Sequence, residues 1–204
     1  MEDRFTSNTR WVRTSWLVSA LGYTAAAILC FVSDKDQMVA ISDWLGAAMM
    51  LNGVLNICIY LFRREAVLGA PWLLADGMMT ALLSMYLLFN QMITPEMIPF
   101  FFGCWEVFSG VLRSVDSIEQ KDEKIRGWKL FCGIGLLELL SGGLAMVKPI
   151  EEYIAVNLIL TFVFSVQAVA FFHRTAIYPR LLVANHRVFL KQKADEDARR
   201  RTVL

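Results

Sequence analysis

The sequence has few of the residues that most enzymes use. It contains two histidines, His173 and His186, and only 19% of its 204 residues are charged. It lacks the HExxH and GxSxG patterns, the Walker phosphate-binding loop and the dinucleotide fingerprint. We therefore expect no catalytic residues, no cofactor and no metal site.

The chain also has few cysteines, few prolines and a small net charge, and each of these facts restricts its structure or function. The four cysteines lie singly in apolar runs without a CxxC pair, which argues against a disulfide framework and against a zinc site. The five prolines fall near the ends of the apolar runs, so none of them breaks a run in its middle. A net charge of +1 excludes a strongly basic nucleic-acid-binding protein.

Long hydrophobic runs dominate the chain instead. Hydrophobic residues make up 56% of it, against roughly 45–50% in soluble domains. Six runs approach or exceed the length of about 20 residues that a helix needs to cross a bilayer. They are Trp16–Ser33, Met38–Phe62, Pro71–Ile93, Met97–Val115, Trp128–Val147 and Glu152–His173. Because backbone groups cannot stay unpaired in hydrocarbon, the runs predict an all-α bundle of six transmembrane helices.

The six runs form three tandem copies of one two-helix unit. Trp16, Trp72 and Trp128 open the first run of each unit at a constant spacing of 56 residues. A pair of glycines in the second run recurs 57 residues later. Tryptophan at the start of a run also suits the headgroup region of a membrane. The expected repeats are about 16–65, 72–120 and 128–174.

Cationic residues gather on one side of the predicted membrane. Only Lys35 and Lys148 fall on one side, whereas the other 18 of the 20 lysines and arginines fall on the opposite side. The positive-inside rule then places both chain ends in the cytoplasm, as expected for a multi-pass protein of an inner (plasma) membrane. We expect cytoplasmic tails at 1–15 and 174–204 around a transmembrane domain at 16–173. The basic C-terminal tail could lie on anionic lipid or extend as a soluble helix.

Four ionisable residues inside the runs are the candidate pH-sensitive or pairing groups, namely Asp76, Glu106, Arg113 and Glu138. Glu138 lies near the middle of its run, where a carboxyl stays neutral unless it is paired. Arg113 could reach Glu106 two turns away, but we expect it to extend to the cytoplasmic surface. Asp76 could meet Lys129 or face the headgroups. The default expectation for each carboxyl is a buried, protonated or hydrogen-bonded structural residue.

Small residues predict close helix packing. The expected packing positions are Gly46, Gly53, Gly103, Gly110, Gly133 and Gly142. We expect them to serve packing within the two-helix hairpins and within the bundle. The amides of Asn52, Asn56 and Gln167 are expected to bond neighbouring helices.

The chain resembles the HdeD-like acid-resistance membrane protein family. The stretches that carry the resemblance are WLLADG at 72–77, FGCWEVFSG at 102–110 and GWKLFCGI at 127–134. The first unit and the last run depart from this pattern. The resemblance implies an integral membrane protein associated with tolerance of acid stress. No catalytic or ligand residue can be carried over from it.

Three functions stay open at this point. The first is a non-enzymatic protein that supports acid-stress tolerance or envelope and pH homeostasis through Asp76, Glu106 and Glu138. The second is a small transporter or channel for protons or small solutes, which the absence of a proline-broken run disfavours. The third is a membrane scaffold that acts through the basic tail. The expected partners are the lipid bilayer, anionic lipid at the tail and further copies of the chain, and no nucleic acid.

Overall fold

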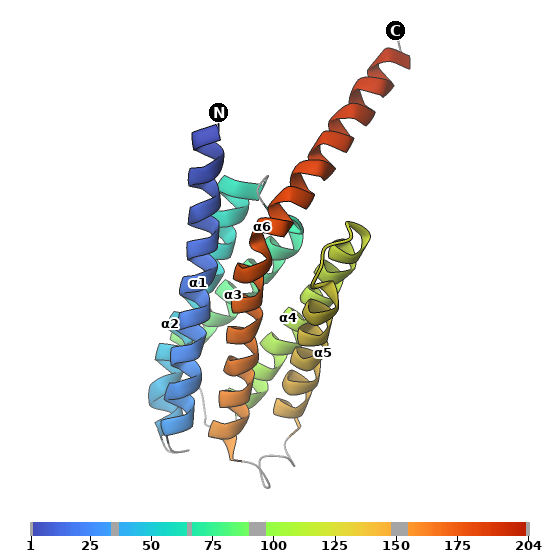
Figure 1. Ribbon diagram of the computed structural model, residues 1–204. Helices are drawn as coiled ribbons and strands as arrows, with labels where there is room; N and C mark the ends of the chain where they lie inside the picture. The colour runs from blue at the N-terminus through green and yellow to red at the C-terminus, as the bar shows by residue number, and fades with distance from the viewer. Residues whose placement is uncertain (1, 34–36, 65–66, 90–96, 148–154, 203–204) are drawn as a thin grey trace.

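Six α-helices make up the part of the chain that the computed structural model describes, which is residues 2–33, 37–64, 67–89, 97–147 and 155–202. The helices are α1 (Glu2–Val32), α2 (Met38–Arg63), α3 (Ala70–Phe89), α4 (Met97–Asp122), α5 (Trp128–Ala145) and α6 (Val156–Thr202). Each contains a stretch long and apolar enough to cross a membrane, and the described residues include no strand. The predicted all-α bundle of six membrane helices is confirmed (Figure 1).

The first and last helices extend beyond the apolar runs. α1 begins at Glu2, and α6 continues to Thr202 although its apolar part ends at Pro179. Figure 1 shows the end of α6 projecting past the rest of the bundle. The segments predicted as tails, 1–15 and 174–204, are therefore largely continuations of helices. A helix propagates through polar residues once it has formed, whereas hydropathy marks only the part that suits hydrocarbon.

Successive helices run in opposite directions through the bundle (Figure 1). The sequence places short segments between the two runs of each unit, and these segments lie outside the described residues: Asp34–Lys35–Asp36, Thr94–Pro95–Glu96 and Lys148–Pro149–Ile150. The α4–α5 connection is described, and it lies at the same end of the bundle as both chain ends (Figure 1). We call this end the terminal end and the opposite one the far end.

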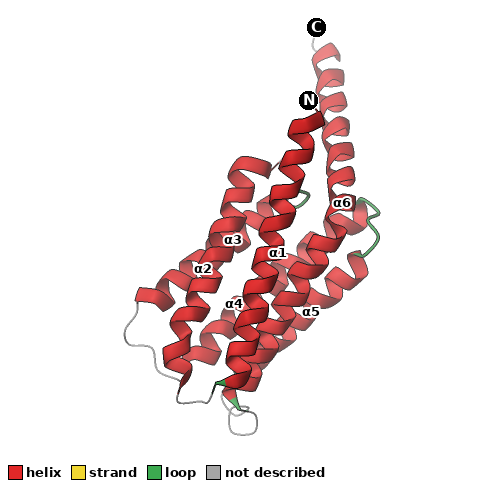
Figure 2. Cartoon of the chain, turned by 60° about the vertical axis from the view of Figure 1, so that its left-hand side comes forward, coloured by secondary structure: helices red, strands yellow, loops and turns green. Residues whose placement is uncertain are grey.

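The helices form a ring whose most extensive contacts join neighbouring units. α2 packs most extensively on α3, α4 on α5, and α6 on α1. The two helices inside each predicted unit share smaller contacts. Figures 1 and 2 show the first and last helix side by side, so their contact closes the ring. The expectation from the sequence was close packing within the hairpins and within the bundle, and the structure places the most extensive contacts between helices of different hairpins.

Glycine allows the close approach of α2 and α3. A β-carbon added at Gly53 would lie 2.8 Å from the backbone nitrogen of Ala81. One at Gly77 would lie 3.0 Å from the carbonyl oxygen of Gly53. Gly46 is less constrained, since its β-carbon would lie 3.3 Å from that of Leu87. Side chains larger than hydrogen at the first two positions would force the helices apart.

The same device recurs between α4 and α5. A β-carbon at Gly103 would lie 2.7 Å from the carbonyl oxygen of Gly142, and one at Gly110 would lie 2.8 Å from that of Gly135. The packing role predicted for Gly133 is wrong, because a β-carbon there meets nothing within 4 Å and the residue is exposed. Gly135 faces α4, whereas Gly133 faces away from the bundle. The spacing of the glycines along the chain does not show which of them faces a neighbouring helix.

Larger side chains fill the contact between α1 and α6. Trp16 is fully buried, with the ring of Tyr178 edge-on at a centroid distance of 5.2 Å and the guanidinium of Arg174 at 5.0 Å. The expectation that Trp16 faces the headgroup region is therefore wrong. α1 begins well before this residue, so Trp16 lies inside the helix contact rather than at a helix start.

Candidate functional site

Charged and amide side chains gather in the interior of the bundle. Ten of the described ones are at most 8% exposed, and seven of these make up the cluster considered as a site, namely Asp76, Glu106, Arg113, Asp116, Glu138, Gln167 and Arg174. They come from α3, α4, α5 and α6. Burying a charge is costly unless it is paired and hydrogen-bonded, and ionisable groups inside a membrane usually mark function. This cluster is therefore the candidate functional site.

Arg113 on α4 lies at its centre. Its Nε donates to Oε2 of Glu138 on α5 at 2.8 Å, and its Nη2 donates to Oε1 of Gln167 on α6 at 3.0 Å. The guanidinium also lies 5.5 and 5.7 Å from the ring centroids of Phe131 and Phe171. The predicted extension of Arg113 to the surface is wrong. Its helix face points inward, where a carboxylate and two aromatic rings replace the water it loses.

Glu106 is held by neutral groups. Nε2 of Gln167 donates to its Oε2 at 2.8 Å, and the hydroxyl of Ser141 lies 3.4 Å from its Oε1. Gln167 thus joins Arg113 to Glu106, with its amide oxygen on one and its amide nitrogen on the other. Among the described residues, Glu106 forms no ion pair, so the direct contact with Arg113 that we considered is not made.

Asp76 on α3 accepts two hydrogen bonds inside the bundle. The hydroxyl of Ser109 donates to its Oδ1 at 2.8 Å, and Nδ2 of Asn56 donates to its Oδ2 at 3.2 Å. The contact with Lys129 or with headgroups that we considered is not made, and the hydrogen bonds of Asp76 agree with the structural role expected by default. Asp76 faces α2 and α4, whereas the ammonium of Lys129 lies 5.9 Å from the ring of Trp128.

A second ion pair lies nearer the terminal end. Nη2 of Arg174 donates to Oδ2 of Asp116 at 2.6 Å, and the guanidinium contacts Trp16 and Phe131, with Phe131 at 5.6 Å. Our sequence analysis missed this pair, since it placed Arg174 in the basic cytoplasmic tail and did not consider Asp116.

A signal for the missed pair is present in the sequence. Polar residues recur on one face of α4 at three- and four-residue steps, and all are buried. They are Glu106, Ser109, Arg113, Asp116, Ser117 and Gln120. Arg174 follows Gln167 by seven residues, which is two turns along one face of α6. A polar stripe of this kind on an otherwise apolar helix indicates an inward face.

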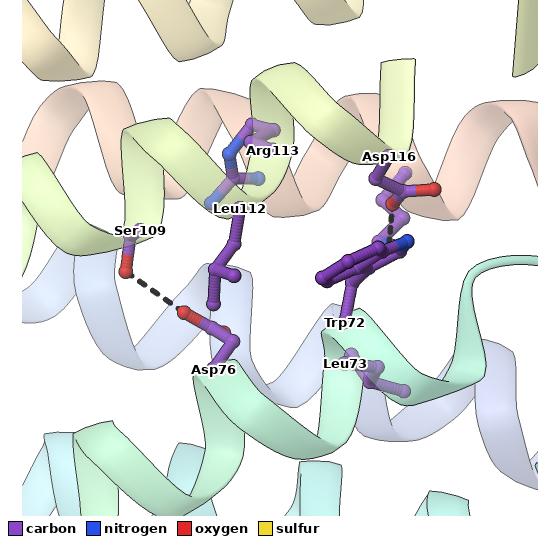
Figure 3. A pocket seen from close by; sticks show the side chains of 8 residues that line it. Trp72, Leu73, Asp76, Ser109, Leu112, Arg113 and Asp116 are labelled. Atoms are coloured by element: carbon purple, nitrogen blue, oxygen red, sulfur yellow. Dashed lines mark hydrogen bonds and ion pairs between the residues drawn. The ribbon is translucent and has the colours of Figure 1, made fainter. Parts of the chain in front are cut away.

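A small cavity lies between Arg113 and the pair of Asp116 with Arg174 (Figure 3). Its lining includes Asp76 and Trp72 from α3, Arg113 and Asp116 from α4, and Arg174 from α6. Its volume of about 10 Å³ admits the centre of roughly one water molecule. Nη1 of Arg113 and Nε of Arg174 have no hydrogen-bond partner among the described residues. A water molecule in this cavity could accept from such a group.

Fold and site together define a polytopic α-helical membrane protein with a buried ionic network. The chain matches the family described as a short repeat of unknown function (DUF308), over residues 18–89 and again over 75–147, and it belongs to that family. The two matches start 57 residues apart, in agreement with the repeat spacing in the sequence. α6 lies outside both, so the third copy stays a prediction. No curated protein and no solved structure is significantly similar to the chain.

Proposed function

We propose that this protein is a non-enzymatic bacterial inner-membrane protein, with both ends in the cytoplasm, that supports tolerance of acid stress. Its proposed working part is the cluster of Glu106, Arg113 and Glu138, which would take up and release protons. The resemblance to the HdeD-like family supports the physiological setting. The imbalance of charge around Arg113 is the observation that carries the proposal.

The imbalance follows from counting the charges inside the bundle. Arg113 forms one ion pair, with Glu138, while Glu106 and Asp76 accept hydrogen bonds only from neutral groups. Asp116 takes up the charge of Arg174. The buried carboxyls therefore exceed the buried guanidiniums, and each excess charge costs several kcal/mol unless a proton neutralises it. The number of protons bound by these buried carboxyls should therefore depend on pH.

The surroundings of Glu106 suit both of its protonation states. Gln167 donates to Oε2 in either state. The hydroxyl of Ser141 lies 3.4 Å from Oε1 and also donates to the carbonyl of Glu138 at 3.1 Å. When Oε1 is protonated, its O–H can donate a hydrogen bond to the hydroxyl of Ser141, which still donates its own hydrogen to the carbonyl of Glu138. Proton uptake by Glu106 therefore needs no rearrangement of its hydrogen-bond partners.

Access to the cluster is expected from the terminal end. The cavity beside Arg113 and the pair of Asp116 with Arg174 lie between the cluster and that end. Toward the far end, packed aromatic rings follow the cluster, and Phe102 and Phe164 lie 5.1 Å apart between centroids. If the terminal end faces the cytoplasm, as the distribution of cations favours, the cluster would respond to cytoplasmic pH.

The test is survival of cells that produce Glu106→Gln after exposure to low external pH. Glutamine keeps the size of the side chain and can bond both Gln167 and Ser141, so we expect normal insertion and abundance. It cannot exchange a proton, so we expect protection to fall to the level of cells without the protein. Survival equal to that with the wild type would refute the role of Glu106.

Asp122→Asn is the matched control. Asp122 ends the same helix as Glu106 but is exposed. The substitution removes one carboxyl from the chain without touching the buried cluster, and we expect full protection from it. Loss of protection by both variants would point to net charge rather than to the buried cluster.

A small transporter or channel is the second candidate, because the same polar interior would also suit a moving ion. The aromatic rings of Tyr23, Phe102, Trp105 and Phe164 pack together on the far side of the cluster, which disfavours a continuous path. Flux of protons into proteoliposomes that depends on Glu106 would favour transport over sensing.

A scaffold remains the third candidate, and the length of α6 favours it. The helix runs for 47 residues, well past the apolar part that ends at Pro179. A helix of this kind could present the basic tail to anionic lipid or to a partner. Truncation after Pro179 would separate this candidate, since it should abolish a scaffold function and leave the buried cluster intact.

A further inference from the structure

The connection between α4 and α5 forms a basic recess at the terminal end of the bundle. The recess has a volume of about 400 Å³. Lys121, Lys124, Arg126 and Lys129 line it together with Trp128, and no carboxylate contributes to its lining. We propose that this recess binds a phosphate group, as carried by the headgroup of an anionic phospholipid or by a free phosphate compound.

The backbone of the connection gathers these cations into one place. Lys124 and Gly127 adopt left-handed conformations, with φ of 56° and 112°. The N–H of Ile125 donates to the carbonyl of Gln120 at 2.9 Å, which closes the end of α4. The chain therefore reverses within a few residues, and cations from the last turn of α4 and the first turn of α5 face the same space.

Trp128 organises two of the cations. The ammonium of Lys121 lies 5.3 Å from its ring centroid and that of Lys129 lies 5.9 Å away. Contacts of this kind hold a flexible lysine in place without neutralising its charge. The two ammonium groups thus remain available to a further anion.

The start of α5 adds partial positive charge to the recess. Gly127 is the N-cap residue, and no side chain caps this helix end by a hydrogen bond. The first N–H groups of a helix point along its axis and attract phosphate. Four cationic side chains beside an uncapped helix start therefore favour a phosphate over a carboxylate or a neutral ligand.

A phospholipid headgroup is the natural source of that phosphate. The apolar span of α5 begins at Trp128, and Leu130, two residues later, is exposed on the surface of the helix. The recess therefore lies where lipid headgroups meet the end of the bundle. The corresponding tryptophan of the preceding unit differs, since Nε1 of Trp72 donates to Glu119 at 2.6 Å.

The experiment measures binding to the purified full chain in neutral detergent by quenching of tryptophan fluorescence and by isothermal titration calorimetry. The probes are short-chain phosphatidylglycerol, short-chain phosphatidylcholine and inorganic phosphate. We expect saturable binding of phosphatidylglycerol, and binding at least about tenfold weaker for the double variant Lys121→Gln with Lys129→Gln. The matched control is Arg63→Gln with Arg64→Gln, which removes two cations from the α2–α3 connection and should bind as the wild type does.

Each outcome decides the question. Binding of inorganic phosphate without binding of phosphatidylglycerol would keep the phosphate site and assign it to a free compound. The proposal is overturned if neither probe binds saturably, if phosphatidylcholine binds as well as phosphatidylglycerol, or if both double variants lose affinity equally. All four substituted residues lie at helix ends, so helix content measured by circular dichroism should not change.

Discussion

Arg113 and Glu138 depend on each other for the balance of charge in the buried cluster. Each is almost fully buried, and each is the other's only ion-pair partner within the described residues. Glu106 differs, since its neutral partners leave it free to gain or lose a proton. One carboxyl of the cluster is thus suited to holding the bundle together, and the other to proton exchange.

This difference predicts opposite effects on stability. Glu138→Gln should lower the free energy of unfolding by about 3–5 kcal/mol, because it removes the one ion-pair partner that the buried guanidinium of Arg113 has among the described residues. The double variant Arg113→Met with Glu138→Leu should recover most of that loss, since it removes both charges. Thermal unfolding in detergent measures both. A double variant less stable than Glu138→Gln alone would contradict the pairing.

At the scale of the helices, glycine residues allow two pairs of helices to pack with their backbones in close contact. Gly53 and Gly77 bring α2 onto α3, and Gly110 and Gly135 bring α4 onto α5. These positions are related by 57 or 58 residues, so the repeat in the sequence is also a repeat of contacts. The site depends on the second contact, because α4 carries Arg113 and α5 carries its partner Glu138.

Gly110→Ala should therefore be damaging. The new methyl group would lie 2.8 Å from the carbonyl oxygen of Gly135 and push α4 away from α5. We expect the free energy of unfolding to fall by about 1–3 kcal/mol. Gly133→Ala is the control, because its methyl group meets open space and alanine favours a helix by up to about 1 kcal/mol. Equal thermal stability of the two variants would show that these glycines do not control the packing.

At the scale of the whole molecule, the chain closes on itself. α6 packs on α1 as extensively as α2 packs on α3. Both chain ends therefore lie at one end of the bundle, together with the α4–α5 connection and its cations (Figure 1). This arrangement separates a basic terminal end from a far end with few cations, and it predicts a single orientation in the membrane.

Labelling of single cysteines tests that orientation. The background is a variant with serine at the four native positions, Cys30, Cys58, Cys104 and Cys132. We expect a membrane-impermeant maleimide to modify Lys129→Cys only from the cytoplasmic side. Ala155→Cys, exposed at the far end before α6, should react only from outside. Modification of Lys129→Cys in intact spheroplasts would reverse the proposed orientation.

The sequence by itself determined the six membrane helices, the repeat of 56 to 57 residues and the concentration of cations at one end. These follow from local hydropathy and composition, which each stretch of about 20 residues carries independently of the rest. The tertiary structure decided that Arg113 points inward to Glu138, that Arg174 is buried against Asp116 and that the closest helix pairs join different units. Those outcomes depend on how each helix is rotated about its axis, and only packing against its neighbours sets that rotation.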